Sequence, residues 1–172
     1  MYRDILLQSI RFIFLVVLQV FVLNQMFQYN LLHPFVYPLF ILLLPVNTSF
    51  FLVLILSFVI GYTVDLLQLT SGIQAAATVF MGFLRIFFLQ ATLSKENFEK
   101  NIKPNIRDKG LAWFSIYAII LLFAHHLVLY FLEVLTFKEF FYTLLKTSLS
   151  AIVSVLISIL LEYLLMPTTK KE

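Results

Sequence analysis

The sequence contains no cysteine, and it is poor in glycine and in charged residues. The absence of cysteine excludes a thiol nucleophile, a disulfide and a thiolate metal site. With only 4 glycines, no glycine-rich phosphate loop is present. Charged residues make up 12% of the 172 residues and hydrophobic residues 62%, whereas soluble domains contain about 25% charged residues. This balance excludes a water-soluble globular fold.

The sequence contains long runs of apolar residues without any charged residue. No Asp, Glu, Lys or Arg occurs between Phe12 and Val64, although one helical crossing of a bilayer needs only about 20 apolar residues. Lipid offers no partner to an open backbone N–H or C=O group, so a spanning segment must be a helix or part of a closed barrel. The runs lack the alternation of a barrel strand. The sequence therefore predicts an all-α, polytopic integral membrane protein.

The apolar runs predict a single domain, residues 1–172, built from about six transmembrane helices. They lie near residues 5–26, 31–46, 49–69, 73–93, 111–132 and 142–166, with a polar loop at 94–110. The second is interrupted by Pro34, Pro38 and Pro45. At about 1.5 Å per residue it reaches roughly 24 Å, less than a typical hydrocarbon core of about 30 Å. We expect this helix to be short, kinked or partly re-entrant.

Basic residues gather in three regions, and cytoplasmic segments collect Lys and Arg. These residues are Arg3 near the N-terminus, Lys95, Lys100, Lys103, Arg107 and Lys109 in the loop, and Lys170 and Lys171 at the C-terminus. Placing all three regions on one side requires an even number of crossings before the loop, so the second helix must cross. Both termini are then cytoplasmic. The loop either faces anionic lipid or forms a specific partner site, and its charge gives no separate support for nucleic-acid binding.

Ionisable side chains inside the predicted helices cost about 2.5–3.5 kcal/mol each at the bilayer centre, so each needs a partner or a function. They are Arg11, Asp65, Arg85, Lys146 and Glu162. Arg11 and Glu162 share the inner leaflet, where they either pair or extend separately to the cytosolic surface. Asp65 and Lys146 share a depth near the external face and form a second candidate pair.

Arg85 lies too deep to pair with Asp65, because it follows the turn by about 18 Å of helix. It is expected to face the bundle interior, a partner helix or the cytosolic surface. His125 and His126 point about 100° apart on a helix and do not suit joint metal chelation. The middle of each helix is mostly Leu, Ile, Val and Phe. We therefore expect no convergent polar set, no metal or cofactor site and no catalytic site.

The most distinctive stretch surrounds Asp65. It reads Gly61-Tyr62-Thr63-Val64-Asp65-Leu66-Leu67, followed by Ser71-Gly72-Ile73-Gln74-Ala75-Ala76-Ala77. Gly61 lets two helices approach closely, and Gly72 breaks the chain between them. Together with the proline-flanked segment from Pro34 to Pro45, this stretch resembles the rod shape-determining MreD family. Gln74 departs from the family pattern, in which histidine commonly stands at that position.

The resemblance implies a non-enzymatic scaffold subunit of the bacterial cell-elongation machinery, without a cofactor, in the cytoplasmic (inner) membrane. Its partner would be the bitopic protein MreC, which would link it indirectly to MreB filaments and to peptidoglycan synthases. The candidate residues for partner binding or for holding the structure are Gly61, Asp65, Leu66, Gly72 and Gln74 from the matching stretch, and Arg85 from its depth in the membrane. The alternative is the substrate-binding membrane subunit of a small-molecule, vitamin-type uptake transporter, which has a similar size and polarity.

Overall fold

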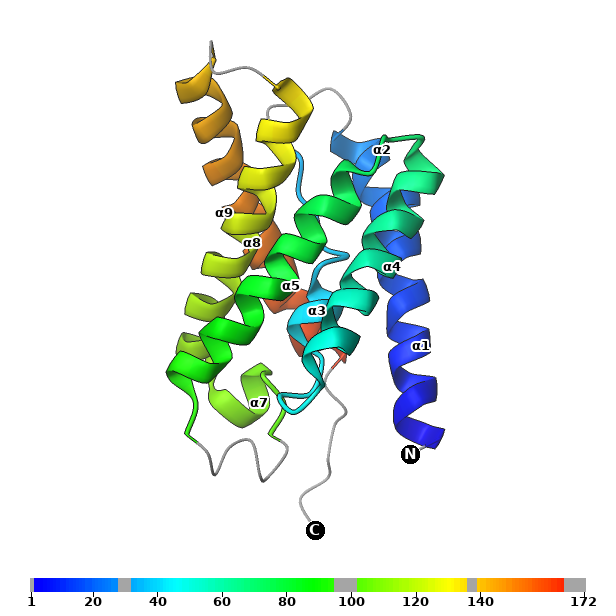
Figure 1. Ribbon diagram of the computed structural model, residues 1–172, viewed down its shortest axis with the longest axis vertical. Coiled ribbons are helices and arrows are strands. Elements are labelled where there is room, and N and C mark those ends of the chain that lie inside the picture. Colours follow the sequence, from blue (N-terminus) through cyan, green and yellow to red (C-terminus); the bar gives the residue numbers. More distant parts are fainter. Residues whose placement is uncertain (1, 28–31, 95–101, 136–138, 166–172) are drawn as a thin grey trace.

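The computed structural model describes residues 2–27, 32–94, 102–135 and 139–165, and these form a helical bundle (Figure 1). Within this part of the chain, five helices are long and apolar enough to cross a membrane. The protein is therefore an all-α, polytopic membrane bundle, as predicted. The predicted number of six spanning helices is wrong.

The five spanning helices match predicted ones closely. The first is a continuous rod of α1 (Tyr2–Val17), the π-helical η1 (Leu18–Leu23) and α2 (Asn24–Phe27). The others are α4 (Phe50–Gln68), α5 (Ile73–Thr92), α8 (Leu111–Val134) and α9 (Phe140–Leu165). The described part of the 94–110 loop contains the short helix α7 (Ile106–Lys109). Hydrophobic run length was therefore sufficient to place these helices.

The predicted helix at 31–46 is replaced by an irregular segment. Its described residues, 32–46, are here named the internal segment. They have no regular structure up to Val36 and then form only the four-residue helix α3 (Leu39–Leu42). Proline explains the difference, because it lacks the N–H group that a helix needs and restricts the residue before it. The segment is nevertheless buried from Pro34 to Leu44.

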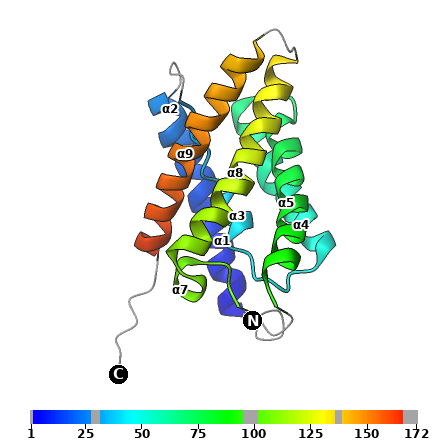
Figure 2. The same cartoon turned by 90° about the vertical axis from the view of Figure 1, so that its left-hand side faces the viewer.

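The internal segment runs through the length of the bundle between the surrounding helices. It leads from the end where α2 lies to the end where α4 begins (Figure 1). We name the first the hairpin end, because the α4–α5 turn lies there, and the second the terminal end. The start of α1, helix α7 and the end of α9 all point toward the terminal end (Figures 1 and 2). The chain thus crosses the bundle an even number of times before α7.

Several basic residues used in the topology argument, Lys95, Lys100, Lys170 and Lys171, lie outside the described residues. Arg107 and Lys109 belong to α7 at the terminal end (Figure 1), and the backbone N–H of Lys103 donates to a carboxylate oxygen of Asp108 in α7 (3.2 Å). Which side of the membrane this end faces remains a prediction from the charge distribution.

Large apolar side chains cover the outside of the bundle, while many polar side chains are buried inside. The fully or nearly buried polar residues include Gln19, Asp65, Gln74, Thr78, Arg85, His125, His126, Ser150 and Ser154. A protein in water would bury the apolar groups and expose the polar ones. The expectation of an interior without convergent polar groups is therefore wrong, because the sequence shows how many polar residues each helix has but not that they face one another.

Single cysteines introduced into this cysteine-free chain test the topology. Lys103→Cys at the terminal end and Leu69→Cys at the exposed α4–α5 turn should label on opposite sides of the membrane. We expect a membrane-impermeant thiol reagent to label Leu69→Cys in intact cells, and Lys103→Cys only after the membrane is opened. The unmodified chain supplies the blank. Labelling of both positions in intact cells would contradict their placement on opposite sides of the membrane.

Candidate functional site

The hairpin-end half of the internal segment is held by hydroxyl groups from α8 and α9. The backbone N–H of His33 donates to Oγ of Ser150 (3.0 Å), and the carbonyl of His33 accepts from the hydroxyl of Tyr130 (3.0 Å). One turn further along α9, Oγ of Ser154 accepts from the backbone N–H of Phe35 (2.9 Å) and lies 3.0 Å from Nε2 of His126. Side chains here form the hydrogen bonds to the backbone that a neighbouring strand would form in a sheet.

Gln19 holds the same stretch from the opposite side. Its Oε1 accepts from the backbone N–H of Val36 (2.7 Å), and its Nε2 donates to the carbonyl of Pro34 (3.2 Å). These are the two groups that a residue of a parallel strand would bind. Nε2 also donates to Oδ1 of Asn24 (2.7 Å), which fixes the orientation of the amide. Gln19 lies in η1, and π-helical turns often occur at functional sites.

The side chain of Tyr37 joins the internal segment to α5 and α8. Its buried hydroxyl donates to Oε1 of Gln74 (2.8 Å), lies 3.0 Å from Oγ1 of Thr78 and lies 2.7 Å from Nε2 of His125. Nδ1 of His125 is buried and has no hydrogen-bond partner. This cluster ties the middle of the bundle together.

Arg85 and Tyr117 hold the terminal-end half of the internal segment. Arg85 is 1% exposed, and its Nη2 donates to the carbonyls of Leu44 and, at 3.3 Å, Pro45. Its Nε donates to the hydroxyl of Tyr117 (3.0 Å), which in turn donates to the carbonyl of Leu42 (2.9 Å). Of the predicted locations for Arg85, the bundle interior is the one observed. Its charge is compensated there by carbonyl dipoles.

Asp65 caps the N-terminus of α5. Its carboxylate is 1% exposed and accepts from the backbone N–H groups of Gln74 (3.2 Å) and Ala75 (2.8 Å) and from the hydroxyl of Thr70. These N–H groups belong to the first turn of α5, where backbone N–H groups have no partners within the helix. A negative charge there also interacts favourably with the helix dipole. Asp65 thus fixes α5 against α4.

Two glycines complete this helical hairpin. A Cβ atom added to Gly61 would lie 2.6 Å from Cα of Ala75, so only glycine permits the observed approach of the two backbones. Gly72 precedes α5 with a φ angle of +84°, a left-handed conformation that glycine adopts without strain. The predicted roles of Gly61 in close packing and of Gly72 in the turn are confirmed. The two glycines and Asp65 therefore act on one structural unit.

The predicted pairing of Asp65 with Lys146 is wrong. Nζ of Lys146 lies 3.5 Å from a carboxylate oxygen of Glu133 and 4.3 Å from the ring centre of Tyr130. Asp65 instead accepts hydrogen bonds from the backbone of α5. The prediction failed because two residues at equal depth in the membrane can lie on different sides of the bundle. Arg11 donates to Gln8 (3.4 Å), while Glu162 lies near enough to interact with Arg11 electrostatically.

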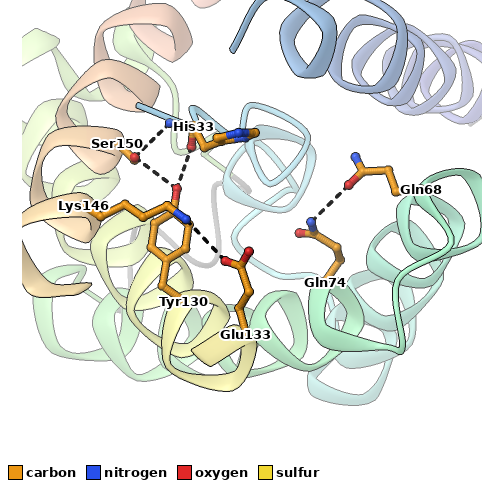
Figure 3. A network of polar contacts seen from close by, with 7 residues as sticks. All are labelled: His33, Gln68, Gln74, Tyr130, Glu133, Lys146 and Ser150. Atoms are coloured by element: carbon orange, nitrogen blue, oxygen red, sulfur yellow. Dashed lines mark hydrogen bonds and ion pairs between the residues drawn. The ribbon is translucent and has the colours of Figure 1, made fainter. Parts of the chain in front are cut away.

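A pocket of about 420 Å³, lined by both polar and apolar side chains, opens at the hairpin end. One wall carries Lys146 and Glu133 from α9 and α8, and Figure 3 shows Gln68 and Gln74 from α4 and α5 on the other side. Nε2 of Gln74 donates to Oε1 of Gln68 (3.5 Å). The pocket is within the range of about 300–1,000 Å³ typical of small-molecule sites. It is the candidate functional site of this protein.

Comparisons with models of protein families, with curated proteins and with solved structures found no match to this chain. In the part of the chain that the structure describes, no group of His, Asp and Glu is arranged to hold a metal ion. The chemistry of the pocket must therefore be inferred from its own polar groups.

Sequence reasoning missed Gln19, Tyr37, Tyr117 and Glu133 as important residues. Gln19 and the two tyrosines carry no formal charge, and a single glutamine or tyrosine in an apolar run gives little signal. The one available sign was the proline-interrupted stretch: an irregular segment in a membrane needs polar side chains to bind its backbone. That requirement could have directed attention to polar residues in the middle of the other helices.

Replacing Gln19 with methionine should destabilise the bundle, because Val36 N–H and Pro34 C=O lose their partners. A buried group left unpaired costs about 1–3 kcal/mol. Gln25→Met, six residues along the same rod at an exposed position, is the matched control and should cost much less. The measurement is the midpoint of thermal unfolding in detergent. Equal midpoints for the two variants would show that the glutamine bridge does not stabilise the fold.

Asp65→Leu should lower stability by about 1–3 kcal/mol, since it leaves two first-turn N–H groups of α5 unpaired. Asp65→Asn keeps one acceptor oxygen and should lose less. The same detergent assay, combined with membrane abundance, measures both variants. Unchanged stability in Asp65→Leu together with lost binding of a partner protein would instead show that Asp65 serves a partner rather than α5.

Proposed function

We propose that this protein is a non-enzymatic membrane scaffold subunit of the bacterial cell-elongation machinery, of the MreD type. It would act in the cytoplasmic membrane, with both termini in the cytoplasm. Its direct partner would be an MreC-like bitopic protein, and through that protein it would support MreB filaments and peptidoglycan synthases. Rod shape would depend on this assembly.

The α4–α5 hairpin supports the proposal first. The residues on which the resemblance rests most, Gly61, Asp65 and Gly72, meet in one interlocked unit. Residues that match the family pattern and together build one local structure support the family assignment better than the same number of matches scattered through the fold. The spacing of the motif is explained by the geometry of the cap and of the close approach.

The outer face of α4 is the observation that carries the proposal. Phe51, Ile55, Phe58, Tyr62 and Leu66 are exposed and follow one another at intervals of three or four residues, which places them in one stripe. The rings of Phe58 and Tyr62 are stacked, with centres 5.4 Å apart. Helices associate in lipid through van der Waals packing of their side chains. We propose that the membrane helix of the bitopic partner packs along this stripe.

The polar side chains that hold the internal segment and α5 offer little for catalysis. Asp65, Arg85 and Gln19 are each occupied with backbone groups of the same chain. A catalytic group needs an accessible position and a partner that activates it. Groups already committed to holding the fold do not meet that requirement, which supports a scaffold over an enzyme.

The alternative function is the substrate-binding membrane subunit of a small-molecule transporter. The pocket at the hairpin end favours it, because Lys146, Glu133, Gln68 and Gln74 converge there. A transporter subunit, however, typically places its site near the middle of the membrane. This pocket lies toward one end of the bundle, because Gln68 and Glu133 lie at the ends of α4 and α8 and Gln74 lies at the start of α5.

A photo-crosslinking amino acid in place of Leu66 tests the scaffold proposal in native membranes. Leu66 on α4 is 59% exposed, and Leu156 on α9, 62% exposed, is the matched control on another face. We expect position 66 to crosslink to a bitopic protein of the elongation machinery and position 156 to yield no such product. The crosslinked proteins are identified by mass spectrometry.

A bitopic partner captured only from position 156 would place the contact on α9 and reject the α4 stripe. Capture of the components of an uptake transporter, such as its ATPase, would favour the alternative function. If neither position captured an elongation protein and loss of the chain left cell shape unchanged, the scaffold proposal would be wrong.

A further inference from the structure

The pocket at the hairpin end has two chemically different walls. Lys146 and Glu133 carry opposite charges and are both accessible, with 22% and 52% of their side-chain surface exposed. Across the pocket, Gln68 and Gln74 present a pair of amides (Figure 3). The ammonium and carboxylate are 3.5 Å apart, so a ligand can separate them at small cost.

The charge of the pocket favours a ligand without net charge. Lys146 and Glu133 cancel each other, so a simple anion or cation would pair with one of them and leave the other unpaired. A zwitterion supplies one partner to each group, and so replaces both halves of the ion pair that it separates.

Gln68 supplies a second, independent sign of a ligand. Its Nε2 is buried and has no hydrogen-bond partner, although Gln68 lines the pocket. The orientation of the amide pair follows from Tyr37, whose hydroxyl donates to Oε1 of Gln74, so that Nε2 of Gln74 faces Oε1 of Gln68. Rotation of the Gln68 side chain would bring this unpaired donor into the pocket, where an acidic oxygen of a ligand would satisfy it.

We propose that this pocket binds a small zwitterion, with its carboxylate or phosphate between Lys146 and Gln68 and its ammonium group against Glu133. Two sources carry this chemistry: a free zwitterion from the aqueous phase, such as an amino acid or a short peptide, and the ethanolamine phosphate headgroup of a membrane lipid. The pocket goes beyond the scaffold proposal and does not depend on it, because a partner protein can bind to α4 whether or not a ligand occupies the pocket.

Thermal unfolding of the purified, delipidated protein in detergent tests the proposal, with glycylglycine as the free zwitterion. A ligand at about ten times its Kd should raise Tm by about 3–5 °C for a protein of this size. Phosphatidylethanolamine in nanodiscs is the lipid probe, with phosphatidylglycerol as the lipid that lacks the ammonium group. Maltose serves as a neutral sugar.

Two variants test whether the rise in Tm comes from binding in this pocket. Gln68→Leu removes the unpartnered donor and should fold normally but lose the rise in Tm, as should Glu133→Gln. Glu139→Gln is the matched control, because Glu139 is an exposed carboxylate near the same end that does not line the pocket. It should keep the full response.

A rise with glycylglycine assigns the site to a free zwitterion, and a rise only with phosphatidylethanolamine assigns it to the lipid headgroup. A response to maltose alone, no response to any probe, or a response that survives both Gln68→Leu and Glu133→Gln would overturn the proposal. Each of these outcomes is read from Tm and is separate from partner crosslinking at Leu66.

Discussion

The fold depends on the need to satisfy the backbone of an irregular segment that runs inside a membrane bundle. A helix binds its own backbone groups, but the internal segment is a short helix flanked by irregular chain, and lipid offers it nothing. Gln19, Ser154, Tyr117 and Arg85 supply the missing partners from four helical elements. Along α8, the contacts from Tyr130 to Tyr117 cover about 20 Å of helix. The helices are therefore positioned by what the segment between them requires.

The same constraint explains why buried polar groups are tolerated here. Arg85 would be costly at this depth beside lipid, but it lies among carbonyls that need donors. Asp65 is likewise buried at a helix start whose N–H groups need an acceptor. In both cases an ionised side chain and an unpaired backbone group satisfy each other. Removing either member would leave the other exposed to an apolar interior.

The sequence allowed the five long helices to be placed, because apolar runs of about 20 residues have few other interpretations. It also indicated the close approach at Gly61 and the turn at Gly72. It did not reveal the cap formed by Asp65, because a capping contact between two helices depends on their rotation and not on their spacing along the chain. The pairing of Lys146 with Glu133 was missed for the same reason.

The pocket and the internal segment share residues, and this has a thermodynamic consequence. Gln74 accepts from Tyr37 and donates to Gln68, while Tyr130 both lines the pocket and binds the carbonyl of His33. A ligand that binds only when these side chains are in place stabilises the arrangement that holds the segment. By reciprocity, a change that destabilises the packing of the internal segment lowers the affinity of the pocket for its ligand. An occupant of the pocket would therefore stabilise the packing of the helices around the internal segment.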